Sequence, residues 1–226
     1  MKGSSHTILW PKYDDYRLGV LIGMTYGDGN LIKRSTALRT GRWRVEFCEG
    51  DLSLVEKYAS LTKRLFNVAP RIRDRRTWYE AYYSSRIAYE FLTFVAEHPN
   101  GKKTGLLEIP SVARLYPLTL RGLICGLFSV EGSVKDRRYP RLAMEMLEPK
   151  LIESDVEELP RLGFNPHTYR YLKDGKMMFG VFLYGREGCE RFLEEVGLMG
   201  KRSRKLSRFL TPPPQASLAR KQPGGG

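Results

Sequence analysis

Two apolar stretches, about one hundred residues apart, constrain the fold of this chain more than any other feature of its sequence. LGVLIGMTYGDGNL begins at Leu18, and LRGLICGLFSVEGSV begins at Leu120. Each stretch carries glycine at four-residue intervals and ends on a lone carboxylate followed by glycine. The two acids are Asp28 and Glu131, which lie 103 residues apart. This spacing predicts a chain built from two copies of one structural unit.

Both stretches predict helices that approach another helix closely. Glycine in a helix interior costs about 1 kcal/mol relative to alanine, so its repetition needs a physical reason. Residues four apart lie along one face of a helix, where missing side chains let two backbones come close together. A membrane dimer is excluded because neither stretch reaches the roughly 20 apolar residues of a bilayer span. We therefore expect the two helices to pack on each other about a pseudo-twofold axis, through Gly19, Gly23, Gly27, Gly122 and Gly126.

The repeat extends beyond these two helices. The apolar periodicity predicts the order helix, strand, strand, helix, strand, strand, helix in each unit, and the class is therefore α+β. Asp14 or Asp15 is the expected N-cap of the first helix. In the first unit, helices are expected over 15–26, 51–66 and 86–97, and strands over 30–38, 42–48, 70–76 and 78–85. The expected segments are an N-terminal arm (1–14), the first unit (15–97), a linker (98–117), the second unit with a following basic helix (118–210) and a disordered tail (211–226).

The charge of the chain favours a polyanionic partner. The 226 residues carry a net charge of +13, which places nucleic acid well ahead of a membrane. The cysteines at positions 48, 125 and 189 lack metal-site spacing and indicate reduced thiols. The first residues lack the apolar core of a signal peptide. We expect a cytoplasmic protein, or an organellar one in a eukaryote, with no secretion signal.

The predicted strands alternate between an apolar face and a cationic face. Between residues 42 and 47, arginine and glutamate alternate with tryptophan, valine and phenylalanine. A solvated sheet face usually mixes both signs of charge, whereas these faces carry an excess of cations. Strands can enter the major groove of DNA, where arginine suits guanine edges and phosphates. The candidate DNA-binding residues are Lys33, Arg34, Arg39, Arg42, Arg44, Glu46, Arg71, Arg73, Arg75, Arg76, Trp78, Tyr82, Lys135, Arg137, Arg138, Arg141, Glu145, His167, Tyr169, Arg170 and Lys173.

Asp28 and Glu131 emerge side by side if the two glycine-bearing helices pack together. Two carboxylates there repel each other and face the negative ends of two helix dipoles, which is unfavourable without a cation. Oxygen ligands favour Mg²⁺ over zinc, with phosphate and water in the remaining positions. No zinc-finger or His-Asn-His spacing is visible among His6, His98 and His167. A metal between paired carboxylates, beneath a basic face, suits phosphodiester hydrolysis.

The two stretches resemble the two motifs of the LAGLIDADG homing endonucleases, in the single-chain form. Leu21-Ile-Gly-Met-Thr-Tyr-Gly-Asp28-Gly29 matches the nine-residue motif position by position, and Ile124-Cys-Gly-Leu-Phe-Ser-Val-Glu131-Gly132 matches it from its first residue. The motif is degenerate, but its two copies and the repeated αββαββα order extend the match over about residues 15–197. The resemblance implies a pseudo-dimer with the motif helices at its centre and two antiparallel sheets that form a saddle over a long DNA site.

The resemblance also implies a site-specific double-strand break that depends on a divalent metal and leaves short 3′ overhangs across the minor groove. The motif acids carry over to Asp28 and Glu131 as catalytic residues. The same two acids, with Gly27 and Val130, are the expected metal ligands. Mg²⁺ is the expected ion, and Mn²⁺ is the expected substitute.

The auxiliary catalytic residues stay open, because the chain departs from the family there. Many members carry basic or amide residues near the end of the second strand of each unit, where this chain has Glu49 and Glu148. Glutamate at these places is also favourable as a cap of the following helix. Glu148 and Lys150 formally fit the E-x-K tail of another nuclease class, although a three-residue match carries little information.

We expect a monomer that binds double-stranded DNA and is encoded within an intron or an intein-type element. One alternative is an intron RNA maturase, with host intron RNA as its partner. Another is a DNA-binding regulator that keeps the fold and has lost cleavage. Retention of both acids favours the nuclease, because a pure binder has no need to hold two carboxylates against a polyanion.

Overall fold

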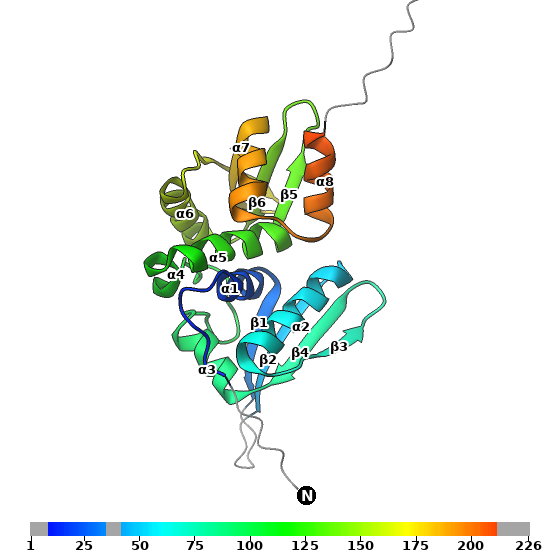
Figure 1. Ribbon diagram of the computed structural model, residues 1–226, viewed down its shortest axis with the longest axis vertical. Coiled ribbons are helices and arrows are strands. Elements are labelled where there is room, and N and C mark those ends of the chain that lie inside the picture. Colours follow the sequence, from blue (N-terminus) through cyan, green and yellow to red (C-terminus); the bar gives the residue numbers. More distant parts are fainter. Residues whose placement is uncertain (1–8, 35–41, 212–226) are drawn as a thin grey trace, which may run out of the picture.

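The chain folds as two αββαββα units that meet along their first helices, α1 (Tyr16–Asp28) and α5 (Pro117–Val130) (Figure 1). The computed structural model describes residues 9–34 and 42–211. In Figure 1 the two helices cross the middle of the molecule, with one sheet and its helices on each side. The predicted α+β pseudo-dimer, with the glycine-bearing helices at its centre, is therefore confirmed.

The first unit has the predicted order of elements, and its first two helices begin at side chains that cap them. Asp15 accepts a hydrogen bond from the Arg17 N–H over 2.8 Å, and Asp51 accepts one from the Ser53 N–H over 3.1 Å. The four strands form an antiparallel sheet of order β1-β2-β4-β3. After α1 come β1 (Gly29–Arg34), β2 (Arg42–Glu49), α2 (Leu52–Phe66), β3 (Arg71–Asp74), β4 (Tyr79–Ser84) and α3 (Arg86–Phe94).

The second unit repeats this arrangement with the sheet order β5-β6-β8-β7. Its helix α7 continues as a short π-helical turn over Phe192–Val196, and α6 continues as a 3₁₀ turn over Leu159–Leu162. A basic helix, α8, follows as the sequence predicts, and it buries Leu206 and Leu210. After α5 come β5 (Gly132–Lys135), β6 (Arg141–Met146), α6 (Pro149–Glu158), β7 (His167–Lys173), β8 (Lys176–Tyr184), α7 (Arg186–Arg191) and α8 (Gly200–Leu210).

The core lies between each sheet and its helices. On β2, Val45 and Phe47 are fully buried, and Phe47 stacks on Tyr58 of α2 with ring centroids 4.5 Å apart. On β6, Leu142 and Met144 are fully buried on the corresponding face. The period-two pattern therefore assigns the helix side of both central strands correctly, and the opposite side of each sheet is left uncovered by helices.

The segment between the units is more ordered than the sequence indicates. It contains α4 (Ser111–Leu115) and buries Leu107 and Ile109, and α5 begins at Pro117 inside the predicted linker. Proline is favoured at the first helical position, where its missing N–H has no helical partner to lose. In the part of the chain that the structure describes, no helix is both long and apolar enough to cross a membrane.

Candidate functional site

The functional site begins with the contact between α1 and α5, where the two backbones touch. A Cβ atom placed at Gly19 would lie 2.0 Å from the Thr119 carbonyl oxygen, and one at Gly23 would lie 2.1 Å from the Leu123 carbonyl oxygen. The reverse contacts are equally close, since a Cβ at Gly122 would lie 2.0 Å from the Tyr16 carbonyl oxygen. Only glycine permits this approach. The glycine stripe therefore lies at the contact of α1 and α5.

Asp28 and Glu131 meet at the C-terminal ends of these helices. A Cβ at Gly27 would lie 3.2 Å from Glu131 Cγ, so the glycine before Asp28 makes room for the acid of the other unit. Burial, and then the charges of Glu131 and Glu49, raise the pKa of Asp28 to about 7. Burial also raises the pKa of Glu131, although Lys103 and Arg202 act in the opposite direction. The acid pair is therefore partly desolvated and short of positive charge.

Lys103, from the segment between the units, occupies the end of α1. Its Nζ donates to the carbonyl oxygens of Tyr26 over 2.8 Å and Gly29 over 3.2 Å, and it also donates to the carbonyl of Gly27. The last carbonyls of a helix lack partners and carry the negative end of its dipole. Burial lowers the pKa of Lys103, while Glu131 and Asp28 oppose that shift.

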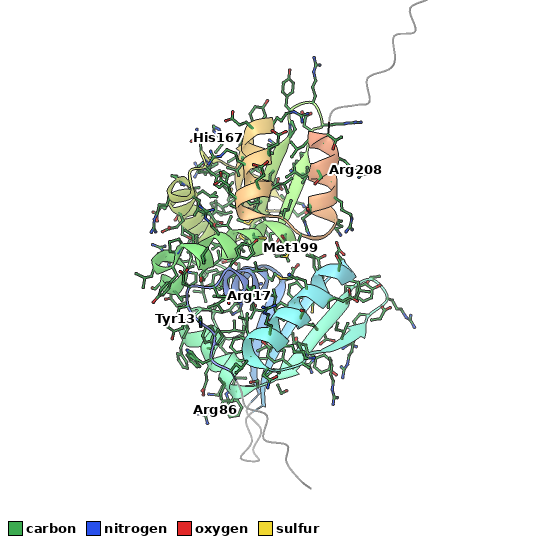
Figure 2. The ribbon with its side chains drawn as sticks, in the orientation of Figure 1. Tyr13, Arg17, Arg86, His167, Met199 and Arg208 are labelled. Atoms are coloured by element: carbon green, nitrogen blue, oxygen red, sulfur yellow. The ribbon has the colours of Figure 1, made fainter. Side chains whose placement is uncertain are left out.

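Arg202 of α8 occupies the end of α5 in the same way. Its guanidinium donates to the carbonyl oxygens of Ser129 over 2.6 Å, and also to those of Val130 and Gly132. Met199, which precedes α8, lies near the same helix end (Figure 2), where its N–H donates to Ser129 Oγ over 2.9 Å. Each helix of the pair therefore ends on a carboxylate and is capped by a cation from a distant segment.

Glu49 and Glu148 support these two cations across the pseudo-twofold axis. Glu49, of the first unit, lies 3.4 Å from Arg202, which caps the helix of the second unit. Glu148, of the second unit, accepts a hydrogen bond over 2.6 Å from the N–H of Gly105, two residues beyond Lys103. Glu49 also accepts from the N–H of Gly50, which precedes the N-cap of α2, whereas Glu148 makes no side-chain cap of α6.

The donors around the acid pair fit a hard divalent cation. Gly27 and Val130 can offer only their carbonyl oxygens, which already accept from Lys103 and Arg202 and keep a second lone pair. Within residues 9–34 and 42–211, no three His, Cys, Asp or Glu side chains gather in a metal-binding cluster. An ion held by Asp28 and Glu131 would therefore complete its shell with carbonyl oxygen, phosphate or water.

The uncovered face of the first sheet is rich in arginine. Arg44 lies 2.6 Å from Glu80, and Arg75 lies 2.6 Å from the other oxygen of the same carboxylate. Tyr82 receives the guanidinium of Arg44 at 4.4 Å and that of Arg73 at 4.1 Å from its ring centroid. Cation–π contacts and ion pairs hold these side chains on the sheet surface.

The uncovered face of the second sheet is aromatic instead. Glu145 accepts from Lys135 over 2.5 Å, from the Tyr171 hydroxyl over 2.8 Å and from the Tyr169 hydroxyl. Burial acts to raise the pKa of Glu145, but these three donors hold it at about 2. His167 stacks on Phe182 with ring centroids 5.2 Å apart, at the upper edge of the molecule in Figure 2.

Two predicted DNA-binding residues lie on the wrong side of their sheets. Lys33 pairs directly with Trp43, and Arg170 pairs with Phe179, so both are placed on the helix side. Neighbours on a strand point to opposite faces, and Tyr169 and Arg170 cannot share one. Arg39 lies outside the described residues, as do the side chains of Arg34 and Arg42. Trp78 and Arg76 lie in the turn after β3, and Arg137 and Arg138 lie in the exposed turn after β5.

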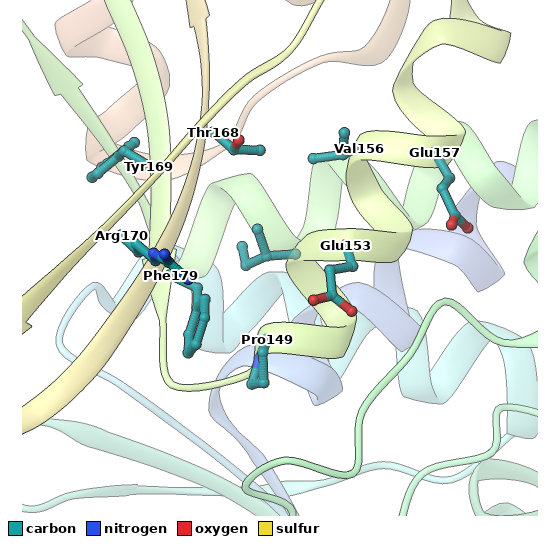
Figure 3. Close-up of a pocket in the computed structure, with 9 residues that line it drawn as sticks. Pro149, Glu153, Val156, Glu157, Thr168, Tyr169, Arg170 and Phe179 are labelled. Atoms are coloured by element: carbon teal, nitrogen blue, oxygen red, sulfur yellow. The ribbon is translucent and has the colours of Figure 1, made fainter.

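Arg170 lines a groove of about 660 Å³ between α6 and the edge of the second sheet (Figure 3). Glu153 and Glu157 of α6 stand on one side, and Phe179 and Thr168 stand on the other. Neither Asp28 nor Glu131 borders it. The groove is therefore separate from the acid pair.

Solved structures share this architecture. A structure from a study of mesophilic variants of the homing endonuclease I-DmoI superimposes with a TM-score of 0.63, at 21% identity, over 82% of this chain and 97% of that one. The fold is that of I-DmoI. A complex of I-DmoI with DNA and Ca gives a TM-score of 0.62 at 19% identity, over 82% of this chain and 91% of that one. Full-length DUF199/WhiA from Thermatoga maritima gives 0.56 at 12% identity, over 88% and 60% of the two chains.

Sequence comparison matches the chain to parts of much longer proteins. No family model matches the chain. It is 24% identical over 194 residues to the replication factor C small subunit of Methanocaldococcus jannaschii, and 25% identical over 203 residues to the replicative DNA helicase DnaB of Rhodothermus marinus. The matches cover 84% and 81% of this chain, but only 10% and 20% of those proteins. The chain therefore spans about a tenth to a fifth of the length of these relatives.

The sequence did not reveal the two capping cations. Lys103 lies in a segment predicted as a linker, and Arg202 is one of several basic residues in α8. Glu80, which is 4% exposed and joins two arginines, also carried no signal in its own strand. The available hint was the unfavourable pairing of an acid with each helix C-terminus, which requires a compensating cation without naming it.

Proposed function

We propose that this chain is a metal-dependent DNA endonuclease that cuts both strands of a long, asymmetric target. The observation that carries the proposal is the meeting of Asp28 and Glu131 at the contact of two pseudo-symmetric units, each with an uncovered sheet face, rich in arginine in the first unit and aromatic in the second. One acid from each unit provides one candidate centre for each strand. The I-DmoI fold, seen for that protein in complex with DNA and Ca, supports this assignment.

Asp28 and Glu131, with the carbonyls of Gly27 and Val130, would hold Mg²⁺, and Mn²⁺ would substitute. A bound metal would lower the pKa of a water and stabilise the leaving oxygen. Lys103 and Arg202 fix the ends of α1 and α5 and place positive charge beside a site that receives phosphate. Short 3′ overhangs across the minor groove follow from the resemblance to the LAGLIDADG enzymes.

The test is cleavage of the host gene's allele that lacks the insertion, with Mg²⁺ or with EDTA. We expect a single double-strand break with Mg²⁺ in the wild type. Asp28→Asn and Glu131→Gln should each lower double-strand cleavage at least about 100-fold and change binding little, since a divalent ion held by these acids would supply several kcal/mol of charge stabilisation in the transition state. Glu56→Gln removes an exposed acid of α2 and is the matched control. Wild-type cleavage by either site variant would refute the assignment.

A binder without nuclease activity is the second candidate, because the fold is also that of DUF199/WhiA, whose name describes no endonuclease. Such a regulator, or an RNA maturase, would bind its nucleic acid and leave duplex DNA intact with every divalent metal.

Both acids and both sheet faces belong to one chain, so the proposal also requires a monomer. Sedimentation should return a mass near 26.0 kDa, and a dimer would contradict the single-chain pseudo-dimer.

A further inference from the structure

The strand registers define equivalent positions on the two uncovered sheet faces. In the first sheet Arg73 of β3 pairs with Glu80 of β4, which pairs with Cys48 of β2. In the second sheet Tyr169 of β7 pairs with Gly180 of β8, which pairs with Glu145 of β6. Arg73 and Tyr169 are therefore counterparts under the pseudo-twofold relation. The carboxylate in the two rows differs in place. Glu80 lies on the strand next to Arg73, whereas Glu145 lies one strand further from Tyr169, beyond Gly180.

Arg73 is exposed but held in position. Its guanidinium lies 4.1 Å from the ring centroid of Tyr82, on the neighbouring strand. Although Glu80 is its partner in the strand register, no carboxylate among the described residues forms an ion pair with Arg73, whereas Arg44 and Arg75 both form ion pairs with Glu80. Arg71 is the cross-strand partner of Tyr82, but among the described residues it makes neither an ion pair nor a cation–π contact. Arg73 therefore combines a fixed position with five unused N–H donors.

The hydroxyl of Tyr169 is already used in a hydrogen bond within the protein. Its hydroxyl donates to Glu145, which also accepts from Lys135 and Tyr171. Its ring lies against the backbone of Gly180, where an added Cβ would stand 2.5 Å from the ring carbon Cζ. The position that offers a cationic fork in the first sheet therefore offers an aromatic surface in the second.

We propose that Arg73 is a specificity-determining residue that reads a guanine in the half-site under the first sheet, and that the equivalent base pair under the second sheet has no guanine requirement. The inference rests on the proposed function, because it assumes that the uncovered faces bind duplex DNA. The two outer N–H groups of a guanidinium match the O6 and N7 acceptors of guanine in the major groove, a pattern that no other base pair presents. Tyr82 fixes the plane of that guanidinium before DNA arrives.

The test is selection of bound duplexes from a randomised pool in Ca²⁺ buffer, followed by affinity measurements on the selected sequence. The wild type should enrich a target with a guanine in one half-site that Arg73→Ala ceases to select. Replacement of that guanine should weaken wild-type binding about fivefold to 100-fold and leave binding by Arg73→Ala nearly unchanged. Arg73→Lys keeps the charge and should still lose the preference, because lysine lacks the fork.

Two further variants separate base reading from charge and from folding. Tyr82→Leu should weaken the guanine preference and Tyr82→Phe should keep it, because only the ring holds Arg73. Arg64→Ala removes one exposed charge on the helix side and should keep the preference.

A uniform loss of affinity for all sequences in Arg73→Ala would make Arg73 a phosphate contact and overturn the inference, while the nuclease proposal would stand. Selection of a sequence whose guanine preference persists in Arg73→Ala would overturn it equally. If the wild type bound no duplex at all, the proposed function would fail together with the inference.

Discussion

At the scale of single residues, two cations explain how α1 and α5 can each end on an acid. Lys103 and Arg202 donate to the last carbonyls of these helices and offset the negative ends of the helix dipoles. The surroundings of the two carboxylates still hold too little positive charge to neutralise them, since the pKa of Asp28 is raised to about 7. That deficit is what a divalent cation would fill.

The raised pKa values predict a stability that depends on pH and on metal. An acid whose pKa is higher in the folded protein than in the unfolded chain favours folding at low pH, and this contribution is lost as the pH rises through the folded value. Without metal, the contribution of Asp28 should therefore be lost between about pH 4 and about pH 7. Millimolar Mg²⁺ should restore about 1–3 kcal/mol above pH 7 and little below pH 5, where the acids are protonated.

The measurement is the melting temperature with EDTA and with Mg²⁺ across this pH range. The double variant Asp28→Asn, Glu131→Gln should lose both the pH-dependent fall and the Mg²⁺ gain. A Mg²⁺ gain that persists in the double variant would show that the ion binds elsewhere.

Asp155 is a second titratable group in an unusual place. It is fully buried in α6, and both of its carboxylate oxygens lack a hydrogen-bond partner among the described residues. Burial raises its pKa well above the usual value. The acid therefore favours folding only at low pH, and its contribution is lost as the pH rises above about 4.

Asp155→Leu should stabilise the protein at neutral pH by about 1–3 kcal/mol, because it removes unpaired buried oxygens. Urea unfolding at several pH values measures the difference between variant and wild type. This difference should grow as the pH rises above about 4. A difference that is the same at every pH would mean that Asp155 is not the titrating group. Asp155→Asn keeps the shape and separates the effect of charge from that of packing.

At the scale of elements, the glycine interface decides how the two units meet. A Cβ at Gly23 would stand 2.1 Å from a backbone oxygen of α5, so a side chain there requires the two helices to move apart. By contrast, a Cβ at Gly188 of α7 would meet nothing within 4 Å. The two glycines provide a matched pair for one substitution.

Gly23→Ala should destabilise the protein by about 1–3 kcal/mol through overpacking. Gly188→Ala should be neutral or should stabilise it by up to about 1 kcal/mol, since alanine is the better helix former. Chemical denaturation of both variants measures these effects. Equal effects from the two substitutions would contradict the close contact of α1 and α5. Because Gly23 lies on the helix that positions Asp28, its variant should also lose cleavage activity.

At the scale of the whole molecule, the two sheet faces give the chain an extended basic surface of unequal halves. The chain has a net charge of +13, and five exposed arginines on these strands and their turns contribute to it: Arg71, Arg73, Arg76, Arg137 and Arg138. The acidic residues of α6 line a groove on the opposite side of the second sheet. The charge is therefore arranged for a polyanion on one side of each sheet.

Binding to duplex DNA should therefore depend steeply on salt. Six or more phosphate contacts would reduce the affinity about 1,000-fold or more between roughly 50 and 200 mM monovalent salt. Filter binding or fluorescence anisotropy of the full chain measures the slope. Arg71→Ala should reduce its magnitude by about 1, and Arg64→Ala should leave it unchanged. A change in affinity below about fivefold over this range would refute the basic-surface interpretation.

The repeat, the order of elements, the helix interface and the pairing of Asp28 with Glu131 could all be predicted from local sequence patterns. These features follow from local periods, because a helix repeats every 3.6 residues and a strand every two, and two similar stretches fold alike. The face of most strand residues followed from the same period. Lys33 and Arg170 are the exceptions: both are cationic, yet the alternation places them on the helix side, so charge alone does not predict the face of a strand residue.

The surroundings of the two acids, and the difference between the two sheet faces, depend on contacts between segments far apart in the chain. Lys103 donates to carbonyls more than seventy residues away, and Arg202 does so at a similar separation. The difference between Arg73 and Tyr169 depends on which strand carries the nearby carboxylate, Glu80 or Glu145. No local period encodes such contacts. They form when burial of the apolar faces brings distant segments together. Cations such as Lys103 and Arg202 are then favourable beside the carbonyl ends of α1 and α5.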